Sequence, residues 1–170
     1  MATKSAYFAN TIFVFIGDHG VAGNANGVYP SLWTTQRLTD HHVPLLFYAP
    51  GLLAPQRRSE VVSQIDVMPT IAGLLHRTYQ NRTLGRDLLD PRLKNHFAFI
   101  TNAADRIGVV TDEHFYIQHL NGGEEQLFSL DNVHAASSEK ENKRVRQSLS
   151  ELSFALFESS RYLLMNNPRN

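Results

Sequence analysis

The chain has 170 residues, which is the length of one ordinary domain and enough to bury a core without disulfide bonds. Its 16 basic and 16 acidic side chains balance, so charge gives no reason to expect binding to nucleic acid or to an anionic membrane surface. Cysteine is absent, which excludes disulfide frameworks, thiolate metal sites and a cysteine nucleophile within this segment.

The first predicted element is a strand over residues 12–17, where β-branched, aromatic and small residues form an unbroken run. Such a run is typical of a strand buried on both faces, as in the middle of a parallel sheet covered by helices. Asp18, His19 and Gly20 follow directly. Open α/β sheets place ligand sites at the carboxyl ends of their strands, and a carboxylate beside an imidazole suits Zn²⁺ or Mn²⁺. The same residues also make ordinary strand-to-loop turns, so the motif alone does not distinguish a metal site from a turn.

A loop rich in Gly and Asn follows over residues 20–31, either as a lid or substrate loop or as a plain surface connection. We predict a short helix over residues 32–39, which contain the only Trp, and a second central strand over residues 45–48. His41 and His42 stand just before that strand. Adjacent strand residues point to opposite faces, so only one of the two can face a site, and the pair is equally consistent with a polar strand entrance.

Residues 66–77 predict a helix, with Asp66 as its N-cap and Pro69 in the first turn, where the missing N–H does no harm. Asp66 is therefore predicted to be structural and not catalytic. The residues with the spacing of one buried helical face are Met68, Ile71, Leu74 and Leu75.

From residue 97 the pattern changes to short apolar runs joined by turn-forming residues, which favours antiparallel hairpins. The predicted strands cover residues 97–100, 107–110, 115–118 and 126–130. A long amphipathic helix is predicted over residues 139–165, with Ser137 and Ser138 at its N-cap, packed on the sheet because its charge is mixed. Its apolar face consists of Val145, Leu149, Leu152, Leu156 and Leu163. The remaining histidines are scattered and predicted to be surface or packing residues; they are His96, His114, His119 and His134.

Three motifs, in this order, resemble the sulfatase branch of the alkaline phosphatase superfamily. They are Asp18-His19-Gly20, then His41-x-Val43-Pro44-Leu45 ending in Ala49-Pro50-Gly51, then Gln64-x-Asp66-x-x-Pro69-Thr70. The resemblance covers residues 9–132 and implies the C-terminal part of that α/β fold. It implies a sheet sandwiched by helices over residues 1–95, followed over residues 96–170 by a small antiparallel sheet and a long C-terminal helix.

The resemblance also implies hydrolysis or transfer of a sulfate or phosphate ester. Asp18 and His19 match the family's metal-ligand pair, and one of His41 and His42 would contact the metal or the bound anion, with His42 slightly favoured. The Asp-His pair is similar to that of lipoteichoic acid synthases and phosphoglycerol-transferase-like proteins. Its imidazole favours Mn²⁺ or Zn²⁺, with Ca²⁺ or Mg²⁺ as alternatives.

In the family the nucleophile lies far upstream of the Asp-His-Gly motif, so no catalytic nucleophile is assigned in this chain. We therefore expect a C-terminal fragment, inactive alone, whose partners are an ester substrate and the missing N-terminal part of the same domain. The parent is expected to be extracytoplasmic and membrane-anchored through that missing region. No apolar run here approaches the ~20 residues of a membrane helix, so this segment is expected to be soluble. The alternative is a non-catalytic binding or regulatory module that keeps the fold.

Overall fold

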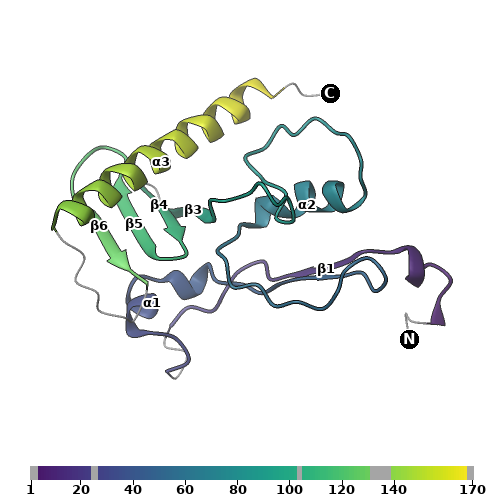
Figure 1. Cartoon of the computed structure of the whole chain (residues 1–170). Coiled ribbons are helices and arrows are strands. Elements are labelled where there is room, and N and C mark those ends of the chain that lie inside the picture. Colours follow the sequence, from purple (N-terminus) through teal and green to yellow (C-terminus); the bar gives the residue numbers. More distant parts are fainter. Residues whose placement is uncertain (1–3, 24–26, 103–104, 131–138, 168–170) are drawn as a thin grey trace. The chain divides into compact units, whose positions relative to one another are not determined.

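The computed structural model describes residues 4–23, 27–102, 105–130 and 139–167 (Figure 1). Its backbone forms two compact units, Met1–Arg58 and Ser59–Asn170. Helices and antiparallel sheets occur together and the chain ends in a long helix, so the predicted α/β class is confirmed. The boundary between these units, at residues 58 and 59, is not the predicted domain division at residues 95 and 96. That division stays a prediction.

The first unit is built on a two-stranded ribbon. Strand β1 (Phe13–Ile16) pairs antiparallel with β2 (Leu45–Tyr48), in a register that places Phe13 opposite Tyr48. The expectation of a parallel, doubly covered strand is therefore wrong for β1. Two strands make up this sheet in the described residues, and side chains such as Phe15 (57% exposed) remain in contact with solvent. An apolar run specifies a strand, but it does not specify the direction of its partner.

Short helical segments connect the two strands of the ribbon. Helix α1 (Ser31–Thr35) and the 3₁₀ turn η3 (Leu38–Asp40) replace the single helix predicted over residues 32–39. Between them Arg37 adopts a left-handed conformation with φ of 58°, which interrupts a continuous helix. Leu38 and Thr39 are buried and anchor this connection before the chain enters β2.

The second unit begins with the 3₁₀ turn η4 (Gln64–Asp66) and helix α2 (Val67–Leu74). Asp66 precedes α2 as predicted, but its side chain does not cap that helix. It accepts the backbone N–H of Ser63 in a capping box around η4. The predicted apolar face is wrong at Met68 (69% exposed) and Leu75 (54% exposed), whereas Ile71 and Leu74 are half-buried. The buried residues of this region are Asp66, Pro69 and Thr70.

The four strands predicted after residue 97 form one antiparallel sheet in sequential order. They are β3 (Phe97–Asn102), β4 (Arg106–Thr111), β5 (His114–His119) and β6 (Glu125–Ser129). The turn between β5 and β6 contains Gly122 and Gly123 at φ of 78° and 128°, where other residues would be strained. The hairpin prediction is confirmed.

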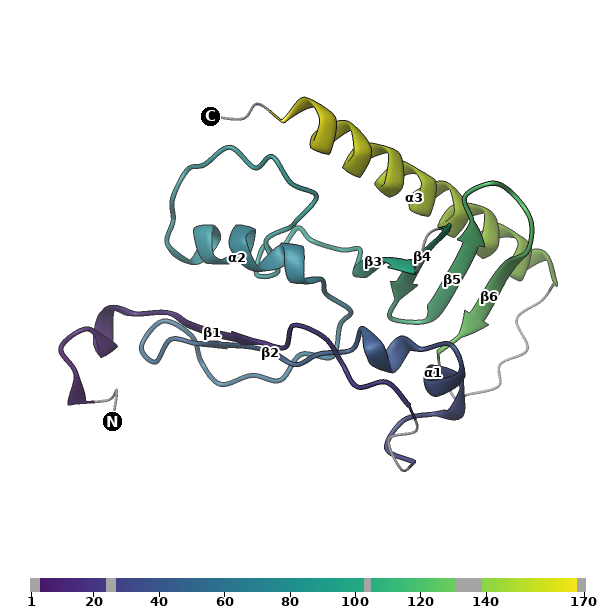
Figure 2. The same ribbon diagram turned by 180° about the vertical axis from the view of Figure 1, so that it is seen from behind.

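Helix α3 (Glu139–Asn166) lies along one face of this sheet, as both views show (Figures 1 and 2). Buried Val109, Tyr116 and Leu149 form the core between them. The other residues packed against this core include Val145, Leu152 and Leu156 from the predicted helical face. Residues 137 and 138, the predicted N-cap, lie outside the described residues.

A buried polar network accompanies the apolar contacts between α3 and the sheet. The Tyr116 hydroxyl lies 2.8 Å from Gln118 Oε1 and 2.6 Å from Glu125 Oε2. Gln118 donates from Nε2 to Ser153 Oγ at 2.6 Å, and Ser150 Oγ donates to Gln118 Oε1 at 3.0 Å. Burial, and then the hydrogen bond to Glu125, raises the pKa of Tyr116 to about 12. Because these bonds need matched partners, they favour one register of the helix on the sheet.

Candidate active site

Asp18 and His19 follow the end of β1 and project into solvent, with 92% of the Asp18 side chain and 79% of the His19 side chain exposed. The backbone N–H of His19 donates to Asp18 Oδ1 at 2.9 Å. His19 Nδ1 lies 2.8 Å from the carbonyl oxygen of Gly20, and Nε2 lies 3.9 Å from Asp18 Oδ2. The carboxylate and the imidazole therefore lie side by side in an accessible position.

The hydrogen bond at Nδ1 defines what the His19 ring offers to a ligand. A carbonyl oxygen accepts, so Nδ1 carries the proton and, in the neutral ring, Nε2 keeps its lone pair. The Gly20 carbonyl, and then the Asp18 charge, raises the pKa of His19 above its usual 6.5. A histidine oriented in this way through its other nitrogen is a common arrangement for metal ligands.

Gly20 holds this pair against the segment that leads to β2. Its N–H donates to the carbonyl oxygen of Asp40 at 2.7 Å. A Cβ at this position would overlap the carbonyl oxygen of Thr39 and lie 2.9 Å from that of His42. Only glycine permits this approach, which brings the backbone of residues 39–42 next to the Asp18-His19 pair.

His41 and His42 differ in what surrounds their rings, although both are exposed. His42 Nδ1 lies 3.2 Å from the Tyr29 hydroxyl, and its ring is perpendicular to Tyr29 and Trp33, with centroids 5.5 and 5.1 Å away. Tyr29 and Trp33 stack on each other at 5.4 Å. Tyr29 and Trp33 were not identified from the sequence. Tyr29 precedes the helix that contains Trp33, so no regular spacing in the sequence indicates that their rings meet His42.

The donors of this site fit part of a divalent metal centre. Carboxylate and imidazole bonds of about 2.0–2.2 Å at a tetrahedral angle would place the two donor atoms roughly 3.4 Å apart, close to the observed 3.9 Å. Within residues 4–23, 27–102, 105–130 and 139–167, no cluster of three or more His, Cys, Asp or Glu side chains could hold a metal ion. Asp18 and His19 could thus supply two ligands, and further ligands would have to come from elsewhere.

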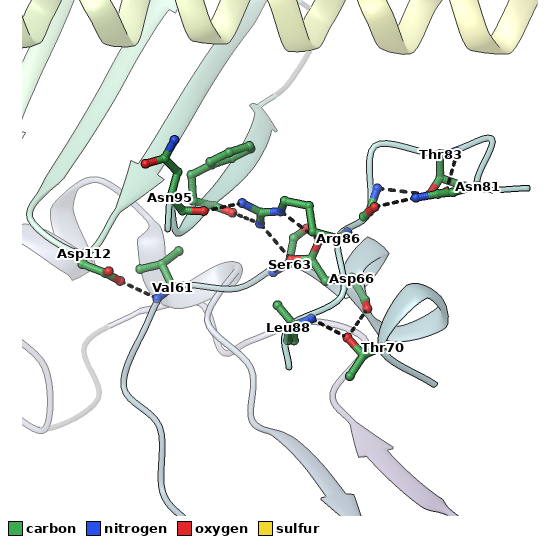
Figure 3. Close-up of polar contacts among 12 residues, drawn as sticks. Val61, Ser63, Asp66, Thr70, Asn81, Thr83, Arg86, Leu88, Asn95 and Asp112 are labelled. Atoms are coloured by element: carbon green, nitrogen blue, oxygen red, sulfur yellow. Dashed lines mark hydrogen bonds and ion pairs between the residues drawn. The ribbon is translucent and has the colours of Figure 1, made fainter. Parts of the chain in front are cut away.

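Asp66, the other carboxylate among the motifs, is fully buried and its oxygens are saturated (Figure 3). Oδ2 accepts from Arg86 Nη2 at 2.8 Å and from the Ser63 N–H at 2.9 Å. Oδ1 accepts the Arg86 backbone N–H at 2.8 Å and Arg86 Nε at 3.2 Å. This geometry agrees with the prediction that Asp66 is structural.

Arg86 extends that connection to β3. Its guanidinium donates to the carbonyl oxygens of Phe97 at 2.7 Å and Asn95 at 3.0 Å, and it lies 3.9 Å above the Phe97 ring. Thr70 Oγ1 donates to the Asp66 carbonyl and accepts the N–H of Leu88 (Figure 3). We call Asp66, Arg86 and Thr70 the buried latch, since they join η4 and α2 to the strand that follows.

The scattered histidines lie at separate places. His119 Nδ1 is 3.0 Å from Asp105 Oδ2, and His114 Nδ1 is 3.9 Å from Glu113 Oε2. His96 has a buried Nδ1 without a hydrogen-bond partner, and His134 lies outside the described residues. In the part of the chain that the structure describes, no helix has the length and apolar character needed to cross a bilayer.

Known proteins resemble this chain in sequence. The sulfatase family model matches residues 1–77. An arylsulfatase of Hemicentrotus pulcherrimus is 25% identical over 132 residues, which are 68% of this chain and 24% of that protein. Arylsulfatase K of Canis lupus familiaris is 30% identical over 80 residues, which are 47% of this chain and 15% of that protein. The chain thus spans about a quarter or less of the curated relatives it matches.

Solved structures show the same fold at lower identity. A protein in the alkaline phosphatase superfamily from Vibrio parahaemolyticus has a TM-score of 0.63 and 20% identity, covering 97% of this chain and 38% of that one. A protein solved in complex with its substrate D-glucosamine-2-N,6-O-disulfate has a TM-score of 0.51 and 16% identity. The match covers 94% of this chain and 36% of that one. The predicted superfamily fold is confirmed, and the predicted sulfatase resemblance is confirmed over residues 1–77.

Proposed function

We propose that this chain is the C-terminal portion of a metal-dependent hydrolase of sulfate esters, and that it supplies part of the metal site. The observation that carries the proposal is the exposed Asp18-His19 pair at the end of β1, with His19 Nε2 free to coordinate. The two curated relatives described above are arylsulfatases, and one structural neighbour was solved with a disulfated glucosamine substrate. These relatives support a sulfate ester over other anionic substrates.

In this proposal each group has a defined role. Asp18 and His19 would hold Mn²⁺ or Zn²⁺, with Ca²⁺ or Mg²⁺ as alternatives, and such an ion polarises the ester oxygens. His42 would contact the ester anion, because its segment is held next to the metal pair through Gly20. The nucleophile and the remaining ligands would come from an N-terminal part of the domain that is not in this chain.

The finer assignment to lipoteichoic acid synthase or phosphoglycerol-transferase-like enzymes rests on His19 alone. An imidazole ligand favours Mn²⁺ or Zn²⁺, and the resemblance associates it with phosphate esters. The membrane anchor and extracytoplasmic location of the parent belong to the same proposal. Assays with matched aryl sulfate and aryl phosphodiester substrates would separate the two ester classes.

The direct test is metal binding and turnover by the 170-residue chain. We expect isothermal titration to show weak binding of Mn²⁺ or Zn²⁺ that disappears when Asp18 and His19 are both changed to Ala. We also expect no ester hydrolysis, because two ligands do not make a catalytic centre. Metal-dependent hydrolysis lost in the double variant would disprove the claim that the chain is inactive alone. Unchanged metal binding in that variant would disprove the assignment of Asp18 and His19 as metal ligands, and it would favour a non-catalytic module.

A further inference from the structure

Three aromatic rings of the first unit meet beside the candidate site. Tyr29 lies just before α1 and Trp33 lies in the middle of it, and their rings are nearly parallel, at 6° to each other. His42 comes from the segment before β2 and stands at 89° to both rings. Edge-to-face contacts at centroid distances of 5.1 and 5.5 Å are a favourable geometry for such pairs.

The hydrogen bond between the Tyr29 hydroxyl and His42 Nδ1, at 3.2 Å, adds a directional restraint. With Nδ1 occupied, Nε2 is the ring nitrogen left for a ligand. When the Tyr29 hydroxyl donates to Nδ1 of the neutral ring, Nε2 carries the proton. When the ring is charged, both nitrogens carry protons and the Tyr29 oxygen accepts. In these two states Nε2 presents an N–H, which is the group that an anion needs. In the other neutral tautomer Nδ1 donates to the Tyr29 oxygen and Nε2 keeps its lone pair, so in the neutral ring an anion contact through Nε2–H requires the Tyr29 hydroxyl to be the donor.

We propose that Tyr29 and Trp33 are positioning residues, which hold the His42 imidazole so that Nε2–H faces the ester anion. This inference rests on the proposed function, in which His42 contacts that anion. It also gives a structural reason for the slight preference for His42 over His41 that the sequence analysis expressed.

The contrast with His41 supports this assignment. The backbone N–H groups of His41 and His42 both donate to the Leu38 carbonyl, at 3.1 and 3.0 Å. Among the described residues, however, only the His42 ring of this pair has an aromatic contact or a side-chain hydrogen bond. A side chain that is already held loses less conformational freedom on binding, which corresponds to about a two- to tenfold gain in affinity.

The test uses the 170-residue chain labelled with ¹⁵N-histidine, in which long-range ¹H–¹⁵N spectra report the protonation of each ring nitrogen. Sodium sulfate is the probe, and it is added to the wild-type chain and to Tyr29→Phe and Trp33→Leu. Tyr7→Phe is the control, because it makes the same chemical change at an exposed tyrosine in the same unit. The wild-type chain should show His42 with a protonated Nε2, and sulfate should shift His42 more than His41.

In Tyr29→Phe we expect a mixed population of His42 tautomers and sulfate affinity weakened about two- to tenfold. Trp33→Leu should weaken binding through a less ordered ring, and Tyr7→Phe should change neither readout. Identical His42 spectra in wild type and Tyr29→Phe would overturn the positioning role, even if sulfate binds. A changed tautomer without any sulfate response in wild type would overturn the anion role of His42, and this inference would fail with it.

Discussion

The exposed pair Asp18-His19 and the buried latch around Asp66 and Arg86 show two different uses of a carboxylate within one set of motifs. Asp18 is 92% exposed and lies beside a histidine whose Nε2 is free to coordinate. Asp66 is fully buried and accepts four hydrogen bonds, from Ser63 and Arg86. A carboxylate with accessible oxygens can take a ligand, whereas one with saturated oxygens can only hold the fold.

The two carboxylates also differ in how much stability is lost when each is substituted. Removing an exposed charge lets water replace its partners, so little free energy is lost. Removing the fully buried Asp66 instead leaves the partly buried Arg86 guanidinium without its counter-charge. Trp33 is the only tryptophan and lies in the first unit, whereas α3 provides much of the helical signal of the second. Fluorescence and circular dichroism therefore report on the two units separately.

The largest effect is expected for Asp66→Ala. This change leaves Arg86 with the carbonyl oxygens of Asn95 and Phe97 but without its carboxylate, at a cost of about 3–5 kcal/mol in the free energy of unfolding. Urea unfolding followed by circular dichroism at 222 nm measures this loss. Arg86→Met combined with Asp66→Ala should cost less than the sum of the single changes. A loss below about 1 kcal/mol in Asp66→Ala would show that the latch does not stabilise the second unit.

The next largest loss of stability is expected when a glycine that lies close to another backbone segment is replaced by alanine. A Cβ at Gly85 would overlap the carbonyl oxygen of Ile65 beside the latch, and one at Gly20 would overlap that of Thr39 beside the metal pair. We expect Gly85→Ala and Gly20→Ala each to cost about 1–3 kcal/mol, because a backbone must move. Gly85→Ala should lower the urea midpoint of the transition followed by circular dichroism. Gly20→Ala should lower the urea midpoint of the transition followed by Trp33 fluorescence.

Gly73→Ala is the matched control for these two variants. The three atoms nearest to its Cβ would belong to the Asp87 side-chain carboxylate, which accepts the N–H of Leu89, and not to a backbone. Alanine also has a higher helix propensity than glycine by about 1 kcal/mol, which offsets the contact. If Gly73→Ala destabilised the chain as much as Gly85→Ala, backbone proximity would not be the cause.

The sequence predicted the elements of the second unit better than their contacts. Four strands and a long helix follow from runs and turns that are local in the chain, and each lies within a few residues of its predicted position. The predicted face of α2 was wrong at Met68 and Leu75. The buried side chains here are Asp66 and Thr70, which bond to Arg86 and Leu88, about 20 residues further along the chain. Hydrophobic periodicity does not include such polar partners, and so it placed Met68 in the core.

For the candidate site the motifs indicated Asp18, His19 and the His41-His42 pair, and those roles remain predictions. The structure adds how these residues are held. Gly20 allows the close approach of two segments, and Tyr29 and Trp33 surround the His42 ring. These relations depend on how the segment that carries α1 and η3 returns toward Gly20. The sequence alone did not specify that path, since its Gly-Asn composition permits many conformations.

A smaller and pH-dependent effect is expected at Tyr116. Its pKa is raised to about 12 from the usual 10, so between pH 10 and 12 the unfolded chain releases this proton while the folded chain keeps it. The stabilisation is therefore complete below pH 10 and is lost as the pH rises through about 12. Absorbance at 295 nm should show a late-titrating tyrosine component, which Tyr116→Phe removes. A late component that persists in Tyr116→Phe would contradict the assignment.

The smallest change in stability is expected at the exposed pair itself. Asp18→Ala and His19→Ala should each alter the free energy of unfolding by less than about 0.5 kcal/mol, because both side chains are largely in water. Chelation with EDTA should also leave both unfolding transitions unchanged, since a structural metal centre needs about four ligands. Thermal unfolding with and without Zn²⁺ measures both. The opposite result would be that chelation lowers the midpoint temperature of the first unit in the wild-type chain and leaves it unchanged in Asp18→Ala. That result would mean that Asp18 and His19 belong to a complete metal site. The contrast with the buried latch would then be one of metal binding as well as exposure.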